Sequence, residues 1–410
     1  MSADIRPYQI AVDQAKIDRL KQKLALTDLP PELDDVEPWS RGVPLPNLKN
    51  VLDYWTTKYD WRSTEAKLNK LPQYITPIEV DGFGNLDMHF IHQQSHVPTA
   101  IPLLFMHGWP GNFTEVEKIL PPLHAGDGKT TPAFHVVSPS LINFGFSDRV
   151  TRGSFSTRQH AESCHKLMIK LGYNRYVIQA GDLGAFTARM MVQHYQSHIG
   201  GHLINLCTPR EPTKEQYPEL WQRCQNAPLT DEEQRGLKRS KWMDKEGMGY
   251  YRLQMTRPQT IGYSMADSPA GLLAWIYEKL HDWTDNYHWT EDEILQWVCI
   301  YYFSTPGPNA TQHIYYESTH VPGSQHGNNY SPVPLGVSRF PAELSLLPKL
   351  WHETLGPLVF WSEHEKGGHF PATERPEELV ADIRAMFGKS GPAAGCCGRA
   401  KSGYVDEVTM

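Results

Sequence analysis

The stretch that decides the fold is Tyr176-Val-Ile-Gln-Ala-Gly-Asp182-Leu-Gly-Ala-Phe-Thr-Ala-Arg-Met190. Its apolar start, residues 176–180, predicts a buried strand, and the residues after Gly184 have the composition of a helix. Small residues around the junction permit a sharp strand-to-helix turn, the nucleophile elbow, which presents one side chain at its apex. Asp182 occupies that apex. Taken alone, the hexapeptide Ala180–Ala185 fits equally well an aspartate that merely caps the helix starting near Gly184.

Further apolar runs on both sides of this turn predict a buried, mostly parallel sheet. Such runs alternating with helices are typical of strands that are covered on both faces. Before them, two alternating strands joined through residues 81–85 predict a hairpin. The core runs span residues 101–106, 134–140, 176–180, 202–207, 333–340 and 357–364, and the hairpin strands span 74–80 and 86–92.

The order of these patterns predicts five segments, with a sheet that is interrupted and later completed. This is the layout of an α/β core with a helical lid. The segment that interrupts the strands is rich in Trp, Tyr and Pro. Helical patterns at residues 10–26 and 45–67 precede the core. The expected segments are an N-terminal meander (1–95), the first half of the core (96–208), the lid (209–325), the second half (326–388) and a flexible Gly-, Ala- and Ser-rich tail (389–410).

The loop after the strand at residues 101–106 reads His107-Gly-Trp109-Pro110-Gly111. Beside a nucleophile elbow, an oxyanion hole combines a backbone N–H of this loop with that of the residue after the nucleophile. Pro110 has no N–H, so the expected donors are Trp109 and Leu183. On its own, this pentapeptide could be only a tight turn.

A histidine lies where this layout places a catalytic base. The stretch Gly367-Gly-His369-Phe370 follows the last predicted strand, as a base does when the chain order is nucleophile, acid, base. The chain has 19 His, so a single one is structural by default. The position after the strand and the preceding glycines single out His369.

These motifs together resemble the epoxide hydrolases of the microsomal type, including their soluble fungal members. The resemblance extends over nearly the whole chain, from the meander through the core and the lid. It implies an α/β-hydrolase fold in which Asp182 is the nucleophile and His369 the base. It also implies that an epoxide is opened to a vicinal diol through an ester on the aspartate, which activated water then hydrolyses.

The resemblance also implies an acid that orients the histidine. The family carries it in a Phe-Pro-x-Glu/Asp stretch after the preceding strand, which residues 340–343 match at Glu343. Glu363 and Glu365 compete because they are nearer to His369 in the sequence. They share a strand-to-loop segment with the histidine, however, whereas a partner for its Nδ1 should come from the neighbouring strand, which favours Glu343.

Two lid tyrosines protonate the epoxide oxygen in the family, and the resemblance assigns them to Tyr250 and Tyr315. The Thr-Arg-Pro at residues 256–258 aligns the first family tyrosine with Tyr250. The neighbouring Tyr251 is the alternative, because the alignment could slip by one residue. Tyr316 competes with Tyr315 in the same way. Tyrosine hydroxyls suit this role because they are neutral donors at pH 7.

The sequence departs from the family pattern at residues 141–147. The family has Pro-Gly where this chain has Ile142 and Asn143. This loop is a candidate for lining the pocket, so the change bears on substrate preference more than on mechanism.

The composition excludes other classes. The net charge of −7 argues against a nucleic-acid surface, and the polar N-terminus lacks the apolar core of a signal peptide. No apolar run reaches the roughly 18 residues of a membrane span. The 6 Cys form no framework, and Cys396-Cys397 gives too little context to assign lipidation. We expect a soluble, cytoplasmic protein without cofactor or metal, whose partners are a small apolar epoxide and water; a homodimer is left open.

Three alternatives remain at this stage. A haloalkane dehalogenase shares the aspartate elbow but binds a departing halide and does not need two lid tyrosines. An epoxide-opening cyclase or a ligand-binding protein of secondary metabolism could use the same scaffold. The identity and stereochemistry of the substrate, and a role in detoxification or biosynthesis, are not encoded in these motifs.

Overall fold

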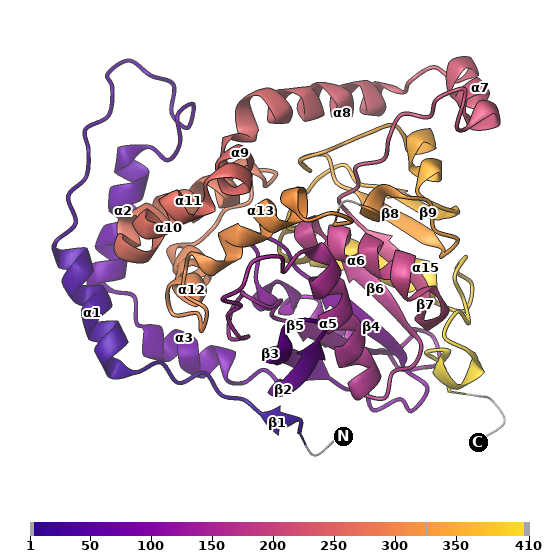
Figure 1. Ribbon diagram of the computed structural model, residues 1–410, viewed down its shortest axis with the longest axis horizontal. Helices are drawn as coiled ribbons and strands as arrows, with labels where there is room; N and C mark the ends of the chain where they lie inside the picture. Colours follow the sequence, from indigo (N-terminus) through magenta and orange to yellow (C-terminus); the bar gives the residue numbers. More distant parts are fainter. Residues whose placement is uncertain (1–3, 325, 406–410) are drawn as a thin grey trace.

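The computed structural model describes residues 4–324 and 326–405; the ends of the expected segments at 1–3, 325 and 406–410 lie outside it. Within the described residues a nine-stranded sheet has the order β1-β2-β3-β5-β4-β6-β7-β8-β9 (Figure 1). The strands are β1 Arg6–Pro7, β2 Gln73–Val80, β3 Gly84–Gln93, β4 Ile101–Met106, β5 Phe134–Pro139, β6 Tyr176–Ala180, β7 Ile199–Ile204, β8 Leu335–Arg339 and β9 Leu358–Glu363.

The sheet has an antiparallel N-terminal part and a parallel core, as the sequence predicted. Strands β1, β2 and β3 pair antiparallel, whereas β5, β4, β6, β7, β8 and β9 run parallel to one another. Every residue of β4, β5, β6 and β7 is buried, which explains their continuous apolar sequences. Strand β6, which leads to Asp182, therefore lies in the middle of the parallel part.

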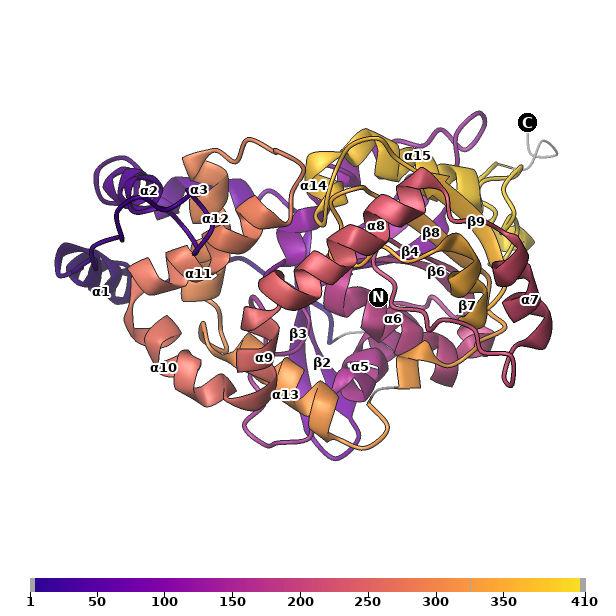
Figure 2. The same cartoon turned by 90° about the horizontal axis from the view of Figure 1, so that it is seen from above.

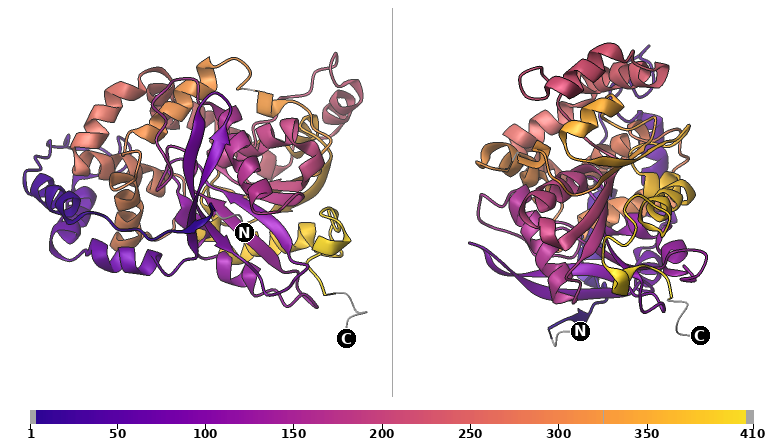
Figure 3. Two further views of the ribbon diagram at one scale, coloured as in Figure 1. Left: turned by 60° about the horizontal axis from the view of Figure 1, so that its bottom comes forward. Right: turned by 90° about the vertical axis from the view of Figure 1, so that its right-hand side faces the viewer.

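Helices cover both faces of this sheet. Helices α5 (Thr157–Lys170) and α6 (Asp182–His194) pack against each other on one face, and α15 (Pro376–Phe387) lies on the opposite face (Figure 3). Two short helices, α4 (Leu120–His124) and α14 (Pro371–Glu374), complete the core. No helix in the described part of the chain combines the length and apolar character needed to cross a bilayer.

The long segment between β7 and β8 is helical, and its helices extend beyond the sheet (Figure 2). Thr230 and Thr290 begin α8 and α12 with capping boxes, in which a threonine and a glutamate satisfy backbone N–H groups reciprocally. The helices are α7 Pro218–Asn226, α8 Asp231–Trp242, α9 Gly249–Thr256, α10 Pro258–Asp267, α11 Pro269–Asp282, α12 Glu291–Tyr302 and α13 His313–His320.

The N-terminal helices α1 (Gln14–Ala25), α2 (Leu45–Thr57) and α3 (Trp61–Leu68) pack against the lid. The Tyr54 hydroxyl donates to the Asp292 carboxylate of α12 at 3.1 Å. The helical pattern expected over residues 45–67 is divided into α2 and α3. The Asp60 carboxylate accepts from two backbone N–H groups at the start of α3, which begins a new helix there.

The C-terminal segment differs from the expected flexible tail. Residues 389–405 pack along the edge of the core, where the Gly403 N–H donates to the Thr99 carbonyl at 2.7 Å and the Ala133 N–H donates to the Gly403 carbonyl at 3.0 Å. Ala393 and Cys397 are buried. Small residues let this backbone approach the core closely, so the Gly- and Ala-rich composition serves packing here.

Candidate active site

Asp182 lies at the apex of the turn between β6 and α6, with a φ of +47° that non-glycine residues rarely adopt. Tight packing surrounds this turn. A Cβ atom on Gly184 would lie 2.3 Å from the Met106 carbonyl oxygen, and one on Gly108 would lie 2.1 Å from Asp182 Oδ1. The glycines thus allow the elbow to approach the loop after β4, as the predicted nucleophile elbow requires.

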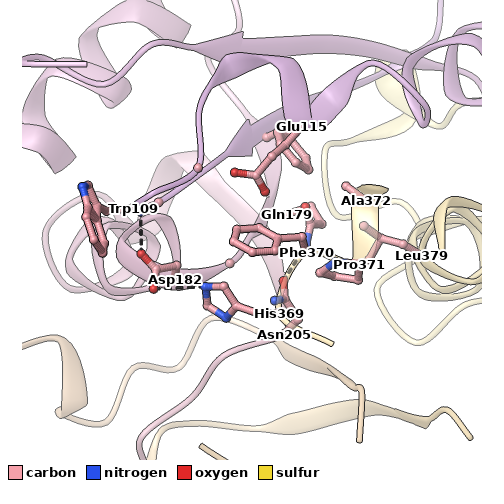
Figure 4. A pocket seen from close by; sticks show the side chains of 14 residues that line it. Trp109, Glu115, Gln179, Asp182, Asn205, His369, Phe370, Pro371, Ala372 and Leu379 are labelled. Atoms are coloured by element: carbon pink, nitrogen blue, oxygen red, sulfur yellow. Dashed lines mark hydrogen bonds and ion pairs between the residues drawn. The ribbon is translucent and has the colours of Figure 1, made fainter. Parts of the chain in front are cut away.

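The loop after β4 directs a backbone donor at the aspartate. The Trp109 N–H donates to Asp182 Oδ1 at 2.7 Å (Figure 4). The lid helix α12 holds this loop, because the Tyr301 hydroxyl donates to the Gly111 carbonyl at 2.6 Å. Leu183, the second expected donor, is buried beside the aspartate and lines the large cavity described below.

His369 lies between two carboxylates. Its Nε2 is 3.3 Å from Asp182 Oδ2, and its Nδ1 is 2.5 Å from Glu343 Oε1. The Asn205 amide donates to the second oxygen of Glu343 at 3.0 Å, and the Leu344 N–H donates to the first at 2.7 Å. Glu343 is completely buried, so these bonds hold its carboxylate in one orientation.

The two carboxylates determine the charge of His369. Burial lowers the pKa of the imidazole, but the charges of Glu343 and Asp182, together with their hydrogen bonds, outweigh burial and raise the pKa to about 10. The two neighbours therefore favour the imidazolium form of His369. Loss of the charge on Asp182 would remove part of this stabilisation.

The sequence competitor Glu363 lies away from the histidine. It is exposed at the end of β9, where its carboxylate accepts from the Trp361 indole N–H at 3.0 Å. The structure therefore brings Glu343, and not Glu363, to His369, as expected for a partner from the neighbouring strand.

Two lid tyrosines lie across from the aspartate. Tyr250, on α9, stacks on the Trp109 ring with centroids 5.3 Å apart, and Tyr315, on α13, meets the Tyr250 ring edge-on at 6.0 Å. Both side chains are buried. Burial, reinforced by the charge of Asp182, raises the pKa of each hydroxyl well above its usual range. Both therefore remain neutral donors.

The alternative tyrosines have different surroundings. Tyr251 is half-buried and lines the large cavity, where its ring meets the Tyr315 ring at 5.5 Å. Tyr316 is 37% exposed and stacks on His320. The Tyr315 hydroxyl is buried without a hydrogen bond of normal geometry to a described residue. It lies near enough to the Tyr250 hydroxyl to lower the pKa of that group, against the larger effect of burial.

A cavity of about 510 Å³ lies between the core and the lid. Asp182 and the tyrosines Tyr250, Tyr251 and Tyr315 form one end. Its walls are largely apolar, and they include Phe186 and Leu206 of the core and Met243 and Met248 of the lid. A cavity of this size and character suits an apolar small molecule.

The loop at residues 141–147 was a candidate for lining the pocket. The structure buries it beneath the lid instead, and these residues are absent from the described lining of the large cavity. Asn143 adopts φ +70°, and its side chain accepts from the Val150 N–H at 2.7 Å. An asparagine tolerates this left-handed backbone, which is where the family pattern has glycine.

Three polar side chains near the site were not found from the sequence. Asn205 follows β7, so its position at the carboxyl end of a core strand was an available signal. Gln179 stands out as a polar residue within the apolar strand β6. Glu115, in the short helical turn after the Trp109 loop, gave no comparable signal, because only the fold brings it to the aspartate.

Comparison with known families agrees with this fold. Residues 101–233 match the family model for the alpha/beta hydrolase fold, and residues 5–116 match the model for the epoxide hydrolase N terminus. The fold and the arrangement around Asp182 thus define an enzyme of the α/β-hydrolase class.

Individual relatives narrow this class. The chain is 40% identical to a protein of Stigmatella aurantiaca that bears an epoxide hydrolase name, over 93% of this chain and 84% of the relative. It is 32% identical to epoxide hydrolase 1 of Sus scrofa over 94% of this chain and 88% of that protein. The structure of Aspergillus niger epoxide hydrolase superposes with a TM-score of 0.81 at 32% identity, covering 93% of this chain and 95% of that one. The chain belongs to the epoxide hydrolase family.

Proposed function

We propose that this protein hydrolyses an epoxide to a vicinal diol through a covalent ester on Asp182. The observation that carries the proposal is the grouping of four components around one carboxylate. An elbow exposes the aspartate, a backbone N–H holds one of its oxygens, a histidine contacts the other, and two buried tyrosines share the cavity with it.

In the first step, Asp182 Oδ2 attacks an epoxide carbon and the carbon–oxygen bond of the ring breaks. The departing oxygen is a poor leaving group without a proton. Tyr250 and Tyr315 supply that proton and a hydrogen bond, which is why two neutral donors face the carboxylate. The product of this step is an alkyl ester of the enzyme.

In the second step, His369 becomes the base. Ester formation neutralises Asp182, which removes one of the two charges that raise the pKa of the imidazole. The imidazolium proton then passes to the tyrosinate that the first step left, so the tyrosine hydroxyl is restored and the imidazole becomes neutral. The neutral imidazole takes a proton from water while the water oxygen attacks the Asp182 carbonyl carbon. Glu343 orients the ring through Nδ1. The Trp109 and Leu183 N–H groups stabilise the oxyanion, and the alcohol leaves with restoration of the aspartate.

The tyrosines favour an epoxide over a haloalkane as the substrate. A halide leaves without a proton, so a dehalogenase would have no use for two buried hydroxyl donors beside the nucleophile. The Tyr315 hydroxyl is buried without a hydrogen bond of normal geometry to a described residue, which suits an oxygen atom of the substrate. The largely apolar cavity suits an apolar epoxide that reaches the nucleophile from the lid side.

Replacement of the base tests the ester directly. We predict that His369→Gln reacts with styrene oxide to form the ester but hydrolyses it at least about 10³-fold more slowly than the native enzyme. Intact-protein mass spectrometry should therefore show an adduct with the mass of the epoxide. His96→Gln, at an exposed histidine, is the matched control and should show turnover without accumulation.

A second variant locates the adduct. Asp182→Asn in the His369→Gln background should abolish the adduct, because the amide is not a nucleophile. An adduct that persists in the double variant, or the absence of any adduct in His369→Gln across several small epoxides, would contradict the proposal.

A further inference from the structure

Behind Asp182 lies a second, much smaller cavity of about 10 Å³ (Figure 4). Its polar lining comprises Glu115, Gln179, Asp182, Asn205 and His369. Among the described lining residues of the two cavities, Asp182 is shared by both. The carboxylate therefore lies between a large, mostly apolar cavity and a water-sized one that several polar side chains line.

The small cavity contains buried polar atoms that the described protein atoms leave unpaired. Glu115 Oε1 and Gln179 Oε1 are both buried without a hydrogen-bond partner among the described residues. Such atoms are costly unless they meet a polar partner, and a buried water is the usual one. A volume of about 10–15 Å³ holds one water, which needs two to four polar neighbours. The cavity fits that requirement.

The amide of Gln179 is held in place. Its nitrogen donates to the Asn205 side-chain oxygen at 3.2 Å, and the Asn205 nitrogen donates to Glu343. Because the amide nitrogen is used, the Gln179 oxygen remains as an acceptor. The same asparagine thus positions both the glutamate that orients His369 and the amide at the cavity.

Glu115 adds a group that is neutral at moderate pH. Burial raises the pKa of its carboxyl to about 8, although the charge of His369 opposes this effect. A protonated carboxyl both donates and accepts hydrogen bonds. It also adds no third negative charge beside Asp182 and Glu343.

We propose that this cavity is the site of the water that hydrolyses the ester, and that Glu115 and Gln179 position that water. The inference rests on the proposed function and adds two residues to it. The water oxygen forms the new bond to the Asp182 carbonyl carbon, and one of its protons passes to His369 Nε2. The other hydrogen is directed to the Gln179 oxygen. The ester C–O bond then breaks, and the diol oxygen takes the proton from the imidazolium. The proton that remains on the Asp182 carboxyl passes to His369, which restores the carboxylate and the imidazolium.

This assignment predicts a selective defect. Glu115→Leu and Gln179→Met remove one water contact each, so they should slow ester hydrolysis by about tenfold or more. The rate of ester formation should change less than about threefold, because substrate enters from the other cavity. Glu115→Gln keeps a neutral donor and acceptor of the same shape and should hydrolyse the ester within about threefold of the native rate.

Rapid-quench single turnovers with styrene oxide, read by intact-protein mass spectrometry, separate the two rates. Glu117→Gln, a partly exposed glutamate on the same loop, is the matched control and should leave both rates unchanged. Thermal unfolding shows which variants fold. If Glu115→Leu does not fold, Gln179→Met tests the same cavity from a different element.

The possible outcomes are distinct. Accumulation of ester in Glu115→Leu or Gln179→Met, with rescue in Glu115→Gln, supports the inference. Equal slowing of both steps, or no slowing of hydrolysis, overturns it and assigns these residues to packing. If even His369→Gln forms no ester, the proposed function fails instead, so the two failures are distinguishable.

Discussion

At the scale of single residues, the chemistry depends on groups whose charges change one another. Glu343 and Asp182 raise the pKa of His369, and in the proposed mechanism ester formation removes one of those charges. Sequence motifs predicted Asp182, His369, Trp109 and the elbow as parts of the site, because each stands at a fixed point after a strand. Glu115, Gln179 and Asn205 were missed, because their proximity arises from three separate strands and loops.

The tyrosines provide a residue-scale prediction. Tyr250→Phe and Tyr315→Phe should each slow ester formation by about 10²-fold, because each removes a donor from the departing oxygen. Burst kinetics with styrene oxide measure this step.

The neighbouring tyrosines serve as controls for that experiment. Tyr316→Phe alters an exposed side chain outside the described cavity lining and should leave ester formation unchanged. Tyr251→Phe tests the one-residue slip that the sequence allowed. If Tyr251→Phe slows ester formation and Tyr250→Phe leaves it at the native rate, the lid donor is Tyr251 and not Tyr250.

At the scale of elements, the elbow is defined by close backbone packing. Strands and their order of appearance were readable from apolar runs, since each buried strand has a continuous apolar sequence. The division between α2 and α3 and the packing of residues 389–405 were not readable. The first depends on one capping aspartate and the second on tertiary contacts of small residues.

The close packing gives an element-scale prediction. Gly184→Ala would place a Cβ 2.3 Å from the Met106 carbonyl oxygen, so the strand-to-helix turn must shift. We expect a loss of about 1–3 kcal/mol in the free energy of unfolding, together with lower activity. Urea denaturation measures the free energy of unfolding, and steady-state turnover measures the activity.

Gly249→Ala is the matched control, because no atom lies within 4 Å of the added Cβ and the residue begins lid helix α9. It should leave stability nearly unchanged. Equal stability of Gly184→Ala and the native protein would show that the elbow tolerates a side chain and is less tightly packed than described.

At the scale of the whole molecule, core and lid enclose Asp182 from two sides. The lid supplies the tyrosines and part of the wall of the large cavity, whereas the core supplies the histidine, its glutamate and the small cavity. The layout of an interrupted sheet with an inserted lid was predictable from the sequence. The two-sided access to one carboxylate was not, because it depends on side chains that meet only in the folded chain.

The measurement that tests the central claim most directly is a single turnover of excess enzyme with styrene oxide in ¹⁸O-water. We predict that the label enters the Asp182 carboxylate, which is read in the peptide that contains it, and that the first diol formed carries no label. The opposite result, a labelled diol and an unlabelled aspartate, would mean that water attacks the epoxide directly and would contradict the ester route.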